Sequence, residues 1–312
     1  MAGAGSQFHL AILGAEDPAG QSFLRALEEA DIPVGILYPL SLNAHEDLPN
    51  IEFRGESWPC VPAEGFVYDE AQALVVTAAH AASATREVAA VRARLPHMPV
   101  LEANAVAPGP AVAIARVLAA LQACCGVQSA DAFVSLPVAL AGLAGVDELV
   151  NQSRGLFNLE SPEPEIFPLQ IAFNQIPLPA DGGRYQPEAL AQGIAQLGVN
   201  APVRLSVVWA PLFYAATVAL HVRPAQAPTA LMLREALKKQ DGVLLMASDL
   251  PAGNPTPATD ASDSDAVFLG QMAVESDAIR LWLVFDPARL EAGLRVAQVE
   301  NWIDRPMNSV LT

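Results

Sequence analysis

The stretch FHLAILGAEDPAG, residues 8–20, determines the expected fold: an apolar run ends at a glycine, followed by an acidic turn and an amphipathic helix. A dinucleotide-binding turn has three glycines at this place, so that the backbone can approach a pyrophosphate at the helix N-terminus. Gly14 and Gly20 are kept, but Asp17 stands at the middle position and Glu16 precedes it. We expect both carboxylates to face the ligand, at a cost on the order of a few kcal/mol. The stretch therefore predicts an ordinary strand-to-helix turn, with Gly14 and Gly20 as vestigial cofactor-binding residues.

The same alternation of short apolar runs and helical patterns continues through residue 123, as is typical of parallel strands covered by helices on both faces. Residues 39–69 interrupt it, because they are rich in Pro, Asn, Glu and Gly, and predict edge structure and loops. We therefore predict an α/β fold that begins with a Rossmann-like parallel sheet. The expected strands are 8–14, 34–38, 73–79 and 100–103, and the expected helices are 22–30, 84–95 and 111–123.

From about residue 131 the apolar runs are separated by hairpin-length gaps or single helices, which predicts a second domain with a mixed, largely antiparallel sheet. Residues 251–265 predict a surface loop, since Pro, Thr, Ser and Asp dominate them. Residues 287–302 begin with Pro and carry an apolar stripe, which predicts a closing helix. The expected strands of this part are 132–138, 169–176, 203–210, 216–223, 243–247, 266–272 and 279–285.

The composition excludes several classes of partner. With 34 acidic and 17 basic residues the net charge is −17, which disfavours nucleic acid and anionic membrane surfaces. The most apolar segments, 110–127 and 133–146, are read as core elements because Arg116 and Asp131 interrupt them before they reach spanning length. The first residues carry no basic signal-peptide region, so we expect a cytoplasmic protein.

Cysteine and histidine usage predicts neither a metal site nor a disulfide framework. The three cysteines form no CxxC pair, and the five histidines show no metal-ligand spacing. We interpret the adjacent Cys124 and Cys125 as small apolar residues at the end of a helix rather than as a redox pair.

A family resemblance emerges in the second half of the chain. The string LQIAFNQIP, residues 169–177, resembles the QIAFN-IP signature of aspartate-semialdehyde dehydrogenases. Together with the opening glycine turn, the resemblance covers nearly the whole chain. Further segments that agree with the family in order and spacing are AGVDEL at 144–149, PTP at 255–257 with VFLG at 267–270, and LWLV at 281–284 with Asp286.

The resemblance implies a domain organisation and an assembly. The Rossmann-like domain would span residues 1–130 and be completed by the C-terminal helix and tail, 287–312. The former catalytic domain, an α+β dimerisation domain, would span residues 131–286. A homodimer is implied, and NADP is the cofactor of the family's reaction.

The family's chemistry needs residues that this chain lacks. Its cysteine nucleophile begins the helix after the last strand of the first domain, near Gly109 here, and no cysteine lies between positions 61 and 123. Neither Ala nor Gly can form the covalent intermediate. The family's histidine acid/base falls near Ala216, while His221, five residues on, is expected to be a surface or core residue.

Two further elements of the family's site are also missing. The charged helix motif for substrate phosphate falls on Gln192–Gln196, which carries no charge, and the nicotinamide-side glutamine falls near Pro137 and Val138. The expected set of catalytic residues is therefore empty.

Three hypotheses follow. The first is a catalytically inactive, Usg-type branch of the family that acts as a homodimer or binds another protein, with no cofactor, or NADP if any. The second is an enzyme of another reaction type in the same cleft, using Ser135, Tyr214 or Asp286, or an NAD(P)-dependent semialdehyde oxidoreductase. The third is a small-molecule sensor without catalysis.

Overall fold

In a computed structural model, the chain forms two compact units. Unit 1 comprises residues 1–106 and 292–312, and unit 2 comprises residues 107–291. The residues that the structure describes are 7–42, 48–77, 82–178, 183–246, 254–275 and 277–304. The predicted strand ends at 78–79 and 247, part of the predicted loop at 251–265, and the tail 305–312 lie outside them.

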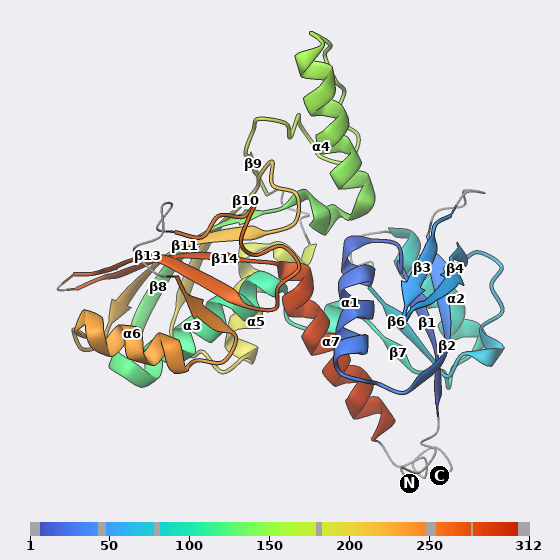
Figure 1. Cartoon of the computed structure of the whole chain (residues 1–312), viewed down its shortest axis with the longest axis horizontal. Coiled ribbons are helices and arrows are strands. Elements are labelled where there is room, and N and C mark those ends of the chain that lie inside the picture. The colour runs from blue at the N-terminus through green and yellow to red at the C-terminus, as the bar shows by residue number, and fades with distance from the viewer. Residues whose placement is uncertain are drawn as a thin grey trace. The chain divides into compact units, whose positions relative to one another are not determined.

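Unit 1 is built around a parallel five-stranded sheet in the order β5-β2-β1-β6-β7, as the alternating pattern predicted (Figure 1). Leu10 and Ile12 point to the face covered by α1 and the later turns of α7, and Ala11 and Leu13 point to the face covered by α2. The elements are β1 (Phe8–Leu13), α1 (Pro18–Glu29), β2 (Val34–Ser41), the β3–β4 hairpin (Asn50–Phe53 and Glu56–Pro59), β5 (Val61–Pro62), β6 (Ala73–Val76), α2 (Ala82–Arg94), β7 (Val100–Leu101) and α7 (Pro287–Ile303).

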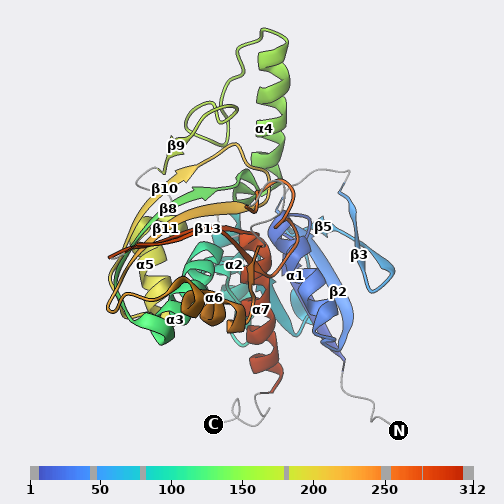
Figure 2. The same cartoon turned by 60° about the vertical axis from the view of Figure 1, so that its left-hand side comes forward.

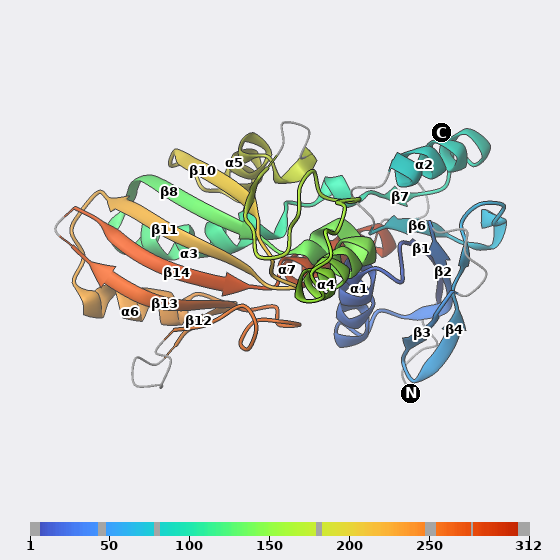
Figure 3. The same ribbon diagram turned by 90° about the horizontal axis from the view of Figure 1, so that it is seen from above.

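Unit 2 is a mixed, mostly antiparallel seven-stranded sheet in the order β12-β13-β14-β11-β8-β10-β9, which confirms the predicted second sheet. Figure 3 views this sheet from above, with α3, α5 and α6 behind it. The elements are α3 (Gly109–Cys125), β8 (Val127–Leu136), α4 (Gly142–Phe157), β9 (Ile176–Pro177), α5 (Pro187–Gln196), β10 (Val203–Trp209), β11 (Ala216–Pro224), α6 (Ala230–Lys239), β12 (Val243–Leu245), β13 (Val267–Val274) and β14 (Ile279–Phe285), followed by the first turn of α7.

Two expectations differ from the structure. Helix α3 lies before the predicted boundary at residue 130, yet it groups with unit 2 because it packs on β8, β11, α5 and α6. The predicted strand 169–176 is wrong: only Ile176 of that run lies in a strand, and residues 171–175 form a turn and extended loop.

One described segment, residues 103–125, is long and apolar enough to cross a membrane, but most of it is buried inside the protein. That burial agrees with its interpretation as a core element. Helix α4 instead projects from the sheet of unit 2, and the chain returns beside it (Figure 2).

Candidate functional site

The turn after β1 keeps the shape of a nucleotide-binding turn. Gly14 has φ of 82°, a left-handed conformation that favours glycine. A Cβ on Gly20 would lie 2.7 Å from the carbonyl oxygen of Ala15, so this position also requires glycine. The Thr77 hydroxyl donates to the carbonyl oxygens of Leu13 and Gly14, at 2.9 and 3.0 Å, and fixes the turn against β6.

Glu16 does not face outward from this turn as expected. Its carboxylate is buried and accepts a hydrogen bond from the Ser41 hydroxyl at the end of β2. Burial raises the pKa of Glu16, and the neighbouring charge of Asp17 adds to the increase. Of the two acidic residues, only Asp17, at the N-cap of α1, is not buried.

A cavity of about 300 Å³ adjoins Ser41 at the carboxyl ends of β2 and β5. Ser83 and Arg86 of α2 line it together with Glu64 and Glu87. The glycine turn fits a pyrophosphate in shape, but the two acidic residues of the cavity outnumber its one cation, Arg86. The described part of unit 1 therefore offers a nucleotide-shaped turn with an unfavourable charge for phosphate.

The start of helix α3 in unit 2 is closed to side chains. A Cβ on Gly109 would lie 2.5 Å from Cα of Pro287, so not even alanine fits without a shift of the backbone. The Gly109 N–H, which would face a ligand at an open helix N-terminus, donates instead to Oε1 of Glu291 at 2.9 Å.

The Glu291 carboxylate is held by a buried polar cluster. Tyr185 OH donates to Oε1 at 3.1 Å, and Arg184 Nη1 lies 3.0 Å from Oε2. Burial alone would lower the pKa of Arg184, but the charge of Glu291 outweighs it, so the pKa is raised and the guanidinium stays charged. The cluster thus places a carboxylate of the chain itself at the anion-binding end of α3. Sequence reasoning missed this cluster, because Glu291 looks like an ordinary acidic residue near a helix start.

The resemblance also implied family positions near Ala216, near Val138 and at Gln192–Gln196. Each of these is packed against other parts of unit 2 or carries no charge. Ala216 is fully buried at the start of β11, opposite Phe285 of β14, while His221 is exposed. Val138 donates its N–H to Leu212 O, and Gly193, within Gln192–Gln196, faces Ala111 and Pro108 of the α3 start.

Three residues, Ser135, Tyr214 and Asp286, were considered for an enzyme of another reaction type, and their surroundings fit a role in the fold. Ser135 is buried in β8, and Tyr214 is exposed beside Phe213. Asp286 accepts N–H bonds from Ala288, Arg289 and Asp263, and so caps α7. Burial raises the pKa of Asp286 to about 6.

Two of the cysteine thiols, those of Cys60 and Cys125, are in buried environments that suppress thiolate formation. Burial raises the pKa of Cys60 to about 12, with a further contribution from the charge of Glu16, and raises the pKa of Cys125 to about 11. Within the described ranges, no group of three or more His, Cys, Asp or Glu residues could hold a metal ion.

The fold is that of a two-unit α/β protein with a parallel sheet in unit 1 and a mixed sheet in unit 2. A family model described as the semialdehyde dehydrogenase dimerisation domain matches residues 118–289, more than half of the chain. The chain belongs to the semialdehyde dehydrogenase family.

Relatives agree over nearly the full length. A USG-1 protein homologue of Azotobacter vinelandii is 26% identical, covering 93% of this chain and 96% of its own. Aspartate-semialdehyde dehydrogenase 2 of Vibrio cholerae is 27% identical, covering 96% and 98%. Among solved structures, aspartate semialdehyde dehydrogenase II of Vibrio cholerae, complexed with ASA, superposes with a TM-score of 0.74 at 23% identity, covering 97% of this chain and 100% of its own. A probable aspartate-semialdehyde dehydrogenase of Pseudomonas aeruginosa gives 0.76 at 22% identity, covering 96% and 99%.

Proposed function

We propose that the protein is a non-catalytic member of the semialdehyde dehydrogenase family that acts as a homodimer through unit 2. It uses no cofactor in a reaction of its own. A non-catalytic dimer of this kind can also act by binding another protein.

The closed start of α3 carries this proposal. The family's nucleophile would stand near Gly109, where Pro287 leaves no room for a side chain and Glu291 occupies the helix N-terminus. A substrate phosphate or carboxylate would have to displace a buried carboxylate that is already paired with Arg184. Close packing at the position expected for the family's cysteine thus supports the proposal.

A turnover assay tests the proposal. The purified protein is incubated with aspartate semialdehyde, phosphate and NADP, and NADPH formation is followed at 340 nm against the Vibrio cholerae relative as a positive control. We expect a rate equal to that of buffer. Saturable, enzyme-dependent NADPH formation would overturn the non-catalytic assignment.

The intact turn of Gly14 and Gly20 favours a second candidate, a nucleotide sensor without catalysis. Calorimetric titration with NADP and NAD separates the two. The non-catalytic dimer predicts no heat of binding, because Asp17 and the acidic cavity oppose phosphate. Saturable binding together with a rise in melting temperature would favour the sensor.

A further inference from the structure

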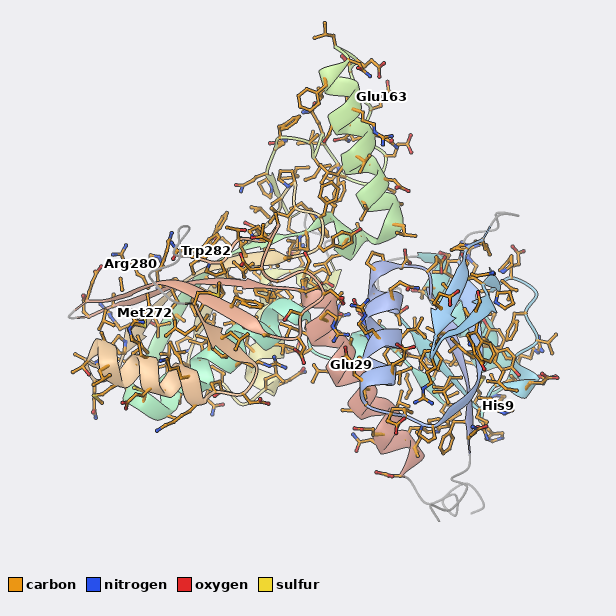
Figure 4. The ribbon with its side chains drawn as sticks, viewed as in Figure 1. His9, Glu29, Glu163, Met272, Arg280 and Trp282 are labelled. Carbon is orange, nitrogen blue, oxygen red and sulfur yellow. The ribbon has the colours of Figure 1, made fainter. Side chains whose placement is uncertain are left out.

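The cavity of about 300 Å³ in unit 1 lies at the carboxyl ends of β2 and β5, the end of the parallel sheet opposite to His9 of β1 (Figure 4). Its first wall is formed by these strand ends, and its second wall by one face of α2. Cavities that hold small molecules occupy about 300–1,000 Å³, so this one suits a small ligand. The polar residues of its lining are Ser41 and Glu64 on the strand wall and Ser83, Arg86 and Glu87 on the helix wall.

Glu64 is placed on the strand wall by an ordered turn. The N–H of Ala63 donates to the carbonyl oxygen of Ser41 at 2.8 Å, and the N–H of Phe66 donates to that of Ala63 at 3.1 Å. Gly65 supplies the left-handed conformation within this turn, with φ of 81°. Among the residues that the structure describes, no hydrogen bond or ion pair engages the Glu64 carboxylate. This wall therefore carries one carboxylate that a ligand cation can take as its partner.

The Ser41 hydroxyl strengthens the preference of the strand wall for a cation. Its proton is donated to the buried carboxylate of Glu16, which lies behind Ser41. Because Glu16 takes this proton, the Ser41 oxygen acts toward a ligand as a hydrogen-bond acceptor. A carboxylate and an acceptor oxygen on one wall suit a ligand ammonium group, which has three donors.

The helix wall supplies the opposite charge. Ser83, Arg86 and Glu87 stand at positions i, i+3 and i+4 of α2 and so share one face of the helix. Glu87 is already engaged, because the Tyr68 hydroxyl donates to its Oε1 at 2.9 Å. The Arg86 guanidinium forms no ion pair with any residue of the described ranges. Arg86 is therefore available to a carboxylate, the group that its planar fork of donors fits best.

We propose that this cavity binds a free α-amino acid as its zwitterion, with the ammonium group toward Glu64 and the carboxylate toward Arg86. A zwitterion matches one available charge of each sign, whereas a phosphate would face two carboxylates and one cation. The remaining lining includes Leu42, Ala63 and Ala90, which favours an aliphatic side chain on the ligand. The inference goes beyond the proposed function, because it gives a non-catalytic protein a small-molecule ligand of a stated class.

Calorimetric titration of the full chain with L-leucine tests the site. We expect saturable binding, accompanied by a rise in melting temperature. Two analogues of the same shape serve as controls: 3-methylbutylamine lacks the carboxylate, and 4-methylpentanoate lacks the ammonium group. Each should bind at least tenfold more weakly, because one charge-assisted contact is lost. An analogue that binds as tightly as L-leucine would overturn the zwitterion assignment, and so would the absence of binding by every common L-α-amino acid.

Two variants assign the contacts. Glu64→Gln and Arg86→Gln should each weaken L-leucine binding at least tenfold. Glu64→Gln should leave the affinity for 4-methylpentanoate unchanged, and Arg86→Gln that for 3-methylbutylamine, a pattern that unfolding would not produce.

The matched controls are Glu56→Gln on β4 and Arg94→Gln in the last turn of α2, since both residues are exposed and lie outside the lining. We expect both controls to bind L-leucine as the wild type does. Wild-type affinity in Glu64→Gln and Arg86→Gln would overturn the site. The turnover assay and the homodimer are independent of either outcome.

Discussion

At the residue scale, single atoms close the start of helix α3. Gly109 has Pro287 against it, and the Glu291 carboxylate accepts both its N–H and the Tyr185 hydroxyl. The absence of a cysteine between positions 61 and 123 can be read directly from the sequence. The residues that surround the start of α3 could not be predicted, because Glu291, Tyr185 and Gly109 meet only through folding and lie up to 182 positions apart.

Gly109 allows a sharp test of this packing. Gly109→Ala should lower the free energy of unfolding by about 2 kcal/mol, the usual cost of forcing a methyl into a filled space. The control is Gly293→Ala in α7, where a Cβ would meet nothing within 4 Å and a gain of roughly 0.5–1 kcal/mol is expected from helix propensity. Urea unfolding measures both. Equal effects of the two variants would contradict the closed helix start.

Asp286 predicts a pH dependence. Its folded pKa of about 6 lies above the ordinary 3.8, so its favourable contribution is complete below that ordinary value and is lost as the pH rises through 6. Between pH 4.5 and 7 the wild type should lose about 2 kcal/mol relative to Asp286→Asn. Unfolding curves at both pH values measure the difference, with exposed Asp277→Asn as the control. A wild type that gains stability relative to Asp286→Asn between pH 4.5 and 7 would contradict the prediction.

At the scale of elements, the strands that alternate regularly with helices could be predicted from the sequence. The loop conformation of the family signature, residues 169–177, could not. The parallel strands of unit 1 follow from apolar runs that any sheet would bury. Residues 169–176 have the same apolar character, yet the Gln152 side chain takes the N–H groups of Ile171 and Ala172 and prevents a ladder. The Gln152 side chain, about 20 positions away in the sequence, thus prevents a strand. Nothing in the local sequence pattern indicates this interaction.

The hydrogen bonds that Ile171 and Ala172 donate to the Gln152 side chain should be detectable by hydrogen exchange. In Gln152→Ala the amides of Ile171 and Ala172 lose their acceptor, and we expect their exchange to accelerate at least tenfold. Gln196→Ala on the exposed end of α5 is the matched control and should leave these amides unchanged. Unaltered exchange in Gln152→Ala would mean that another group protects the loop.

At the scale of the whole molecule, the large negative net charge is expected to affect stability. A net charge of −17 makes the folded chain repel itself, and salt screens that repulsion over a Debye length of about 10 Å at 0.1 M. We expect the melting temperature to rise by several degrees between 10 and 300 mM sodium chloride. Choline chloride, which differs in its cation, should give the same increase, because the effect is screening rather than binding. A constant or falling melting temperature would contradict it.

The last helix also has a consequence for synthesis. Helix α7 gives its first turn to unit 2 and the rest to unit 1, where Ala292, Val296 and Val299 belong to the core built by β1 and α1. Strand β1 therefore waits for residues that are synthesised after the whole of unit 2. Unit 1 can complete its core only after unit 2 has been synthesised.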